Sequence, residues 1–94
     1  MTTVQHAVAL QDLVAEEVRA QLARHRVSAR RLAIRTGWSP MYVSRRLSGQ
    51  LPFSIADLEH VAEVLGIPVT RLLPRSDDGF ITRRERYLRP ALAA

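Results

Sequence analysis

Apolar residues recur at helical spacing from residue 10 to residue 26, and this pattern predicts an amphipathic first helix. Acidic residues come early in this segment and arginines come late, an order that complements the dipole of a helix. Residues 1–9 form either a flexible N-terminus or the start of this helix. The side chains expected to face inward are Leu10, Leu13, Val14, Val18 and Leu22.

The middle of the chain predicts two short helices that meet at a tight turn. Ser28 is the N-cap of the first, and Gly37 supplies the left-handed conformation that ends it. Ser39 and Pro40 begin the second, because serine caps a helix and proline fits its first position. The second helix ends near Gly49. Two short helices joined in this way form a helix-turn-helix, whose second helix can enter a DNA major groove.

A fourth helix is predicted after a short loop. Ser54 followed three residues later by Asp57 marks a capped helix start. An inward apolar stripe follows and closes at Gly66. In the loop before this helix, Leu51 and Phe53 are expected to fill the core.

These elements define the expected architecture. A fifth short helix is predicted over residues 69–73, so the fold class is all-α, a compact five-helix domain over residues 10–74. Residues 75–94 form a short basic C-terminal extension. Within it, residues 82–89 have capping-box form and predict a further short helix.

A particular set of residues surrounds the turn: small Ala33, turn residue Gly37, apolar Trp38 and β-branched Val43. This spacing resembles the lambda-type repressor and Cro proteins, the XRE family of helix-turn-helix DNA-binding proteins. The similarity continues through Ser48–Gly49, the loop 50–53 and the segment Ile55–Pro68, which resembles the fourth helix of that family. It covers about residues 18–73 and implies a lambda-repressor-like fold.

Two positions depart from the family pattern. Ala29 stands where the family often has a glutamine that supports a phosphate contact. Arg46 stands where the family usually has an apolar residue, and Leu47 is expected to take over its packing role. Trp38 is expected to be structural, filling the space between the two helices of the motif.

The charge of the chain is concentrated in one region. All 14 basic residues are arginines, and the net charge is +5. No acidic residue occurs between Glu17 and Asp57, whereas eight arginines do. Acidic residues return on the following helix. Such segregation produces a one-sided positive field that suits DNA phosphates.

Other classes of function find little support in the sequence. The chain has no cysteine, which fits a reducing cytoplasm, and no apolar run near the roughly 18 residues of a membrane span. The absence of lysine excludes P-loop and Schiff-base chemistry. His60 and Glu63 share a helix face but lack a third ligand for a metal. We therefore expect a cytoplasmic protein that is not an enzyme and has no metal, cofactor, small-molecule substrate or membrane partner.

Helical geometry sorts the side chains of the second motif helix, residues 40–48. If its apolar residues point inward, Met41 and Arg45 point outward, because successive residues are rotated by about 100°. Arg45 suits a bidentate contact with guanine, and Met41 suits a thymine methyl group. Tyr42 and Ser44 flank that face and suit either a base or a phosphate. The predicted base-reading residues are Arg45, Met41, Tyr42 and Ser44.

Phosphate contacts are expected around this helix. Helix N-termini offer backbone N–H groups to phosphate, and neighbouring arginines add charge. The predicted phosphate-binding residues are Arg46, Ser39, Ser28, Arg30, Arg31, Arg24, Arg26 and Gln50.

The sequence thus predicts a regulator of transcription that binds double-stranded DNA, a repressor or Cro-like protein of phage or prophage origin. One alternative is an antitoxin that binds both its operator and a partner protein. Another is an interaction protein that keeps the fold without binding DNA. A weak homodimer is expected to use residues 67–73 or the apolar side chains of the extension, which are Phe80, Ile81, Tyr87, Leu88 and Leu92. The alternatives are that these side chains fold back on the same protomer, or that the protein is a monomer. In the monomer, the arginines of the extension form a second DNA contact; they are Arg83, Arg84, Arg86 and Arg89.

Overall fold

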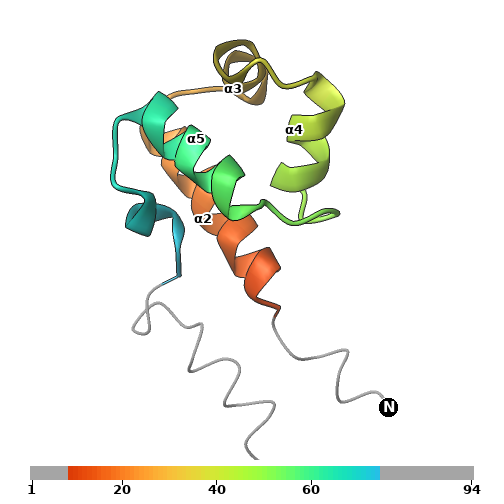
Figure 1. Cartoon of the computed structure of the whole chain (residues 1–94), viewed down its shortest axis with the longest axis vertical. Coiled ribbons are helices and arrows are strands. Elements are labelled where there is room, and N and C mark those ends of the chain that lie inside the picture. The colour runs from red at the N-terminus through yellow and green to blue at the C-terminus, as the bar shows by residue number, and fades with distance from the viewer. Residues whose placement is uncertain (1–8, 75–94) are drawn as a thin grey trace, which may run out of the picture.

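The computed structural model describes residues 9–74, and these residues are all-helical, with no strand among them. Helix α2 spans Leu10–Arg24, α3 spans Ala29–Thr36, α4 spans Pro40–Leu47, α5 spans Ile55–Leu65, and the 3₁₀ helix η1 spans Val69–Leu72. In Figure 1, α2 and α5 run along the same diagonal of the view, with α5 in front, while α3 lies at the top and α4 at the right. The predicted helix at 82–89 and the rest of the extension lie outside the described residues.

The helix starts are those that the sequence predicts. Ser28 Oγ accepts a hydrogen bond from the backbone of Arg31 at 3.0 Å. Ser54 forms a reciprocal capping box with Asp57, and both of its hydrogen bonds measure 2.9 Å. At the turn, Gly37 has φ 83°, a left-handed conformation that strains other residues. Local sequence signals therefore fix the boundaries of the motif helices.

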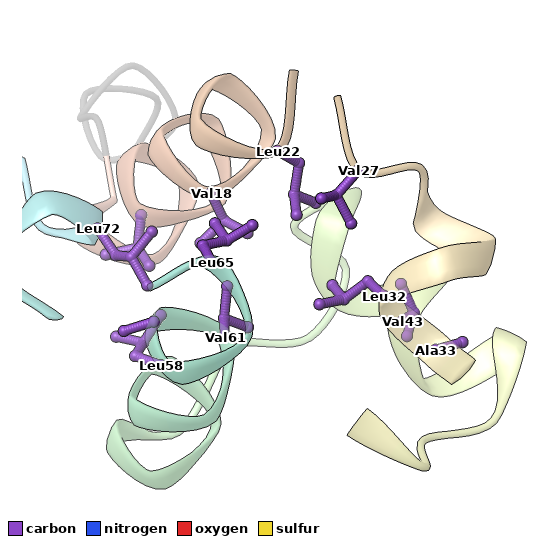
Figure 2. Close-up of a cluster of buried hydrophobic side chains, with 12 residues drawn as sticks. Val18, Leu22, Val27, Leu32, Ala33, Val43, Leu58, Val61, Leu65 and Leu72 are labelled. Atoms are coloured by element: carbon purple, nitrogen blue, oxygen red, sulfur yellow. The ribbon is translucent and has the colours of Figure 1, made fainter. Parts of the chain in front are cut away.

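The core draws on all five elements, and Figure 2 shows its side chains pointing toward one another. Most of the inward stripe predicted for α2 is buried, but Leu10 is 48% exposed. Leu10 is the first residue of α2, and the core cluster begins one turn later, at Val14. The buried hydrophobic cluster comprises Val14, Val18, Leu22, Val27, Leu32, Ala33, Val43, Leu58, Val61, Ala62, Leu65 and Leu72.

The loop before α5 also differs from expectation. Phe53 packs against the core as predicted, but Leu51 is 38% exposed. The backbone N–H of Leu51 donates to the carbonyl of Arg45 at 3.1 Å, so this residue is held to the end of α4 by its main chain. The prediction that Leu51 fills the core is therefore wrong.

The fifth element is a 3₁₀ helix rather than an α-helix. Its hydrogen bonds run from Arg71 N–H to Pro68 and from Leu73 N–H to Thr70, at 3.0 and 3.2 Å. The segment lies between two prolines, Pro68 and Pro74, which leaves too few residues for an extended i to i+4 ladder. Leu72 in this turn is fully buried, so it anchors η1 to the core.

Candidate nucleic-acid interface

The outer face of α4 is open to solvent. Met41 is 60% exposed, and Ser44 and Arg45 are exposed as well. On the opposite side of the helix, Val43 is buried and Leu47 packs against the core. The structure therefore places three of the predicted base-reading residues on one outward surface.

Behind that surface, α4 is joined to α5 by a group that we call the Asp57 cluster, comprising Tyr42, Arg46, Ser54 and Asp57. The Tyr42 hydroxyl donates to Asp57 Oδ1 at 2.7 Å. Asp57 Oδ2 accepts from the Ser54 backbone N–H and lies 3.5 Å from Arg46 Nε. Asp57 is only 7% exposed, so each carboxylate oxygen is engaged within the domain.

Aromatic rings extend this cluster. The Arg46 guanidinium carbon lies 3.5 Å from the centroid of the Tyr42 ring, a cation–π arrangement. The Trp38 ring lies 4.9 Å from that of Tyr42 and meets His60 edge-on at 5.4 Å. Trp38 thus contacts both α4 and α5 and packs on the core, which agrees with the structural role expected for it.

The pKa values of the cluster reflect this arrangement. Burial alone raises the pKa of Asp57, but the hydrogen bonds from Tyr42 and Ser54 and the charge of Arg46 outweigh it, so the pKa is lowered overall. The pKa of Tyr42 is raised, chiefly because its hydroxyl donates to the Asp57 carboxylate. At neutral pH the cluster therefore holds an ionised carboxylate and a neutral phenol.

Two of the predicted site residues make contacts within the domain. Tyr42, predicted to contact a base or a phosphate, and Arg46, predicted to bind a phosphate, both direct their side chains toward Asp57. The Arg46 side chain is only 18% exposed. The buried carboxylate explains both orientations, because an unpaired charge in the interior is costly. These positions lie on the flank of α4 that packs against α5.

Two side chains of helix α2 hold the C-terminal end of α4 and the residues that follow it. Arg19 Nη1 donates to the carbonyl of Leu47, and Gln11 Nε2 donates to the carbonyl of Gly49 at 3.5 Å. The last carbonyls of a helix have no partner within the helix, so these donors satisfy groups that are otherwise free. In the sequence, Arg19 is one of the eight arginines between Glu17 and Asp57 that form the positive field. No sequence signal identifies its target, because the contact joins residues 28 positions apart.

The motif region also carries a set of exposed arginines. They come from the end of α2, the loop that follows it, and both motif helices. Helix α5 instead carries Asp57, Glu59 and Glu63, so positive and negative side chains are segregated between the motif and α5. The exposed arginines of the motif region are Arg24, Arg26, Arg30, Arg31, Arg35 and Arg45.

One of these arginines has an unusual backbone. Arg26 adopts φ 55°, the left-handed conformation that usually falls to glycine at this point after a helix. Its own N–H bonds to Ala23 and the N–H of Val27 bonds to Leu22, at 3.1 and 2.9 Å. Left-handed conformations cost an ordinary residue about 1–2 kcal/mol. This position nonetheless carries an exposed charged side chain.

The two N-cap serines lie at exposed helix starts. Ser28 and Ser39 use their hydroxyls to accept from the backbone N–H groups of Arg31 and Tyr42, so the hydroxyls already serve the helices. Both serines are exposed, as is Gln50. A phosphate at these points would therefore meet backbone N–H groups rather than a free serine hydroxyl.

Residues 9–74 also bear on two other kinds of site. This part of the chain brings together no group of three or more His, Cys, Asp or Glu side chains that could hold a metal ion. Within the same residues, no helix is both long and apolar enough to cross a membrane. The outward face of α4 and its arginines thus form the candidate site.

The fold and this surface define a helix-turn-helix type of DNA-binding domain. The sequence model of the BetR domain, a family of this type, matches residues 9–92, so the chain belongs to the BetR domain family. No curated protein and no solved structure gives a significant match. Family membership indicates a DNA-binding regulatory function.

Proposed function

We propose that this protein is a sequence-specific transcriptional regulator that reads operator DNA in the major groove with α4. The observation that carries the proposal is the outward surface formed by Met41, Ser44 and Arg45 on a short helix, in a region whose other exposed charged side chains are arginines. Arg45 reads guanine through its planar fork of donors, and Met41 packs against a thymine methyl group. Ser44 contacts a base or a neighbouring phosphate.

In this proposal, phosphate contacts fix the register of the protein on DNA. Arginines at the end of α2 and the start of α3 supply charge, and the N-termini of α3 and α4 supply backbone N–H groups. Tyr42 and Arg46 act instead through the orientation of α4, because their side chains are engaged by Asp57. The phosphate-binding set is Arg24, Arg26, Arg30, Arg31, Ser28, Ser39 and Gln50.

At a finer level, we propose a repressor of the lambda or Cro type, encoded by a phage or prophage, that is not an enzyme. The spacing of Ala33, Gly37, Trp38 and Val43 supports this assignment. A single eight-residue helix reads few base pairs, so two protomers on paired half-sites form the working unit. Leu72 is fully buried and therefore takes no part in a contact between protomers.

The test combines selection of genomic binding sites by the purified full chain with affinities measured over a range of salt. If roughly five phosphates are neutralised per protomer, the slope of log K against log salt is about −4 to −5 per protomer. A slope shallower than about −2 on the selected site would contradict an arginine–phosphate face. Failure to enrich any sequence above random DNA would contradict sequence-specific reading.

A further inference from the structure

Helix α5 and η1 enclose a shallow groove, whose apolar lining also belongs to the core or packs against it. Its floor is apolar, formed by Ala62 and by the half-buried Ile67 and Val69. Its wall on α5 carries two exposed acidic residues, Glu59 and Glu63. The groove therefore suits a segment that has apolar side chains with arginines beside them.

Two further exposed apolar residues lie close in sequence to those that line the groove. Ile55 is 72% exposed and lies one helical turn before Glu59 on the same face of α5. Leu73, beside η1, is 38% exposed. These two side chains add exposed apolar surface in the part of the domain that carries the groove.

The chain itself contains a segment of matching chemistry. Residues 80–89 follow the turn-forming run Ser76 to Gly79 and combine apolar residues with arginines. At about 100° per residue, the four apolar residues share one arc; Arg84 falls within this arc, and the other three arginines fall outside it. The apolar residues are Phe80, Ile81, Tyr87 and Leu88, and the arginines are Arg83, Arg84, Arg86 and Arg89.

Position and length favour docking within one molecule. The described chain ends at Pro74, directly after η1, which itself lines the groove. Five residues from Pro74 span up to about 16–18 Å, and α5 with its 11 residues is about 16 Å long. A short tether also gives the segment a high effective concentration at the groove. The BetR domain match extends to residue 92, so this segment belongs to the family domain.

We propose that residues 80–89 dock into the groove between α5 and η1 of their own chain. Apolar side chains cover Ile67 and Val69, and the arginines pair with Glu59 and Glu63. Docking removes this basic segment from the DNA-binding surface and covers the apolar groove. The inference is independent of the function proposed for α4.

The chain has no cysteine, so a single nitroxide label can be attached at Ala91→Cys in the full-length protein. We expect the label to cause selective loss of amide NMR signals along the exposed face of α5 and at Gly66 to Val69, with the signals of α4 preserved. The pattern persists when the labelled protein is diluted with unlabelled protein. Glu59→Arg with Glu63→Arg restores the lost signals, whereas Glu17→Arg on α2 does not.

A charge swap distinguishes a loss of docking from misfolding of the variant. Replacing Arg83, Arg86 and Arg89 by Glu in the Glu59→Arg, Glu63→Arg background should return the signal loss to α5. Loss that appears only when a nitroxide-bearing chain is mixed with a separate isotope-labelled chain would show exchange between copies and overturn docking within one molecule. Loss confined to α4, or no selective loss, would also overturn the proposal.

Discussion

The two motif helices are both eight residues long, but they are held in place by different forces. Helix α3 buries Leu32 and Ala33 in the core. Helix α4 buries only Val43, and polar contacts hold the rest of it in place. The Asp57 cluster holds the middle of the helix, and the hydrogen bond from Arg19 to Leu47 holds its C-terminal end.

This difference follows from what α4 presents to solvent. A short helix with an open outward face has few positions left for apolar burial, so packing alone leaves its rotation poorly fixed. Directional contacts to a buried carboxylate fix that rotation, because hydrogen bonds depend on angle as well as distance. Core changes should therefore alter the stability of the whole domain, and cluster changes should alter the presentation of α4 as well.

The largest loss of stability is expected from a change in the apolar packing of α3. Leu32→Ala removes a fully buried side chain beneath α3 and should lower the free energy of unfolding by about 2–5 kcal/mol. Denaturant unfolding of the full chain measures the loss. Ile34→Ala on the same helix is the control, because Ile34 is 71% exposed and surface changes usually stay within about 0.5 kcal/mol. Equal losses in the two variants would contradict the packing described for α3.

A change in the polar contacts of α4 should lower stability by a smaller amount, and this amount should depend on pH. Asp57→Asn removes the ion pair with Arg46 and one hydrogen-bond acceptor, which should cost about 1–3 kcal/mol of stability at neutral pH. The folded-state pKa of Asp57 is lowered, so its contribution is present above the unfolded pKa of about 3.9 and is lost as pH falls through the folded pKa. The wild type should therefore lose more stability than the variant on acidification.

Tyr42→Phe provides the matched partner for this measurement. It removes only the hydroxyl that donates to Asp57 and should cost about 1 kcal/mol. Combined with Asp57→Asn, the two losses should not add, since both act on one contact. Strictly additive losses, or parallel acid curves for wild type and Asp57→Asn, would contradict the role assigned to the cluster.

Most of the fold could be predicted because its signals are local. The serine caps, the turn glycine and the apolar stripe of α5 each mark a helix boundary that lies within a few residues of the signal itself. The errors lie where a tertiary contact or a neighbouring residue decides. Leu51 is held by its backbone rather than its side chain, and prolines on both sides shorten the fifth element to a 3₁₀ turn.

The site was predicted less completely for the same reason. The rotation of about 100° per residue identifies Met41 and Arg45 as outward residues of α4, because this inference requires only the positions of the apolar residues. It does not reveal that Arg46 turns inward, because Asp57, its partner, lies on the next helix. The signal was nonetheless present: a charged residue replaces the apolar one expected at position 46, and its aromatic neighbour Tyr42 lies one turn earlier.

Adjacent arginines on α4 give the next test of the comparison. Arg45→Ala should weaken binding to the selected operator by about 1–3 kcal/mol and leave stability and binding to random DNA largely unchanged. Arg46→Ala should lower stability by about 1–3 kcal/mol, because it removes the partner of a buried carboxylate. Affinity and unfolding measurements on both variants separate the two roles. Equal loss of operator and random binding in Arg45→Ala would instead make Arg45 a phosphate contact.

The smallest expected change in stability comes from Arg26, where backbone and side chain have opposing demands. Glycine relieves the left-handed conformation but adds freedom to the unfolded chain, so Arg26→Gly should change stability by less than about 1 kcal/mol. Loss of one phosphate contact should make the salt slope shallower by about 0.9. Arg26→Lys should restore the slope, whereas Arg26→Asn, which tolerates the conformation without a charge, should not. An unchanged salt slope in Arg26→Gly would contradict a contact between Arg26 and a DNA phosphate.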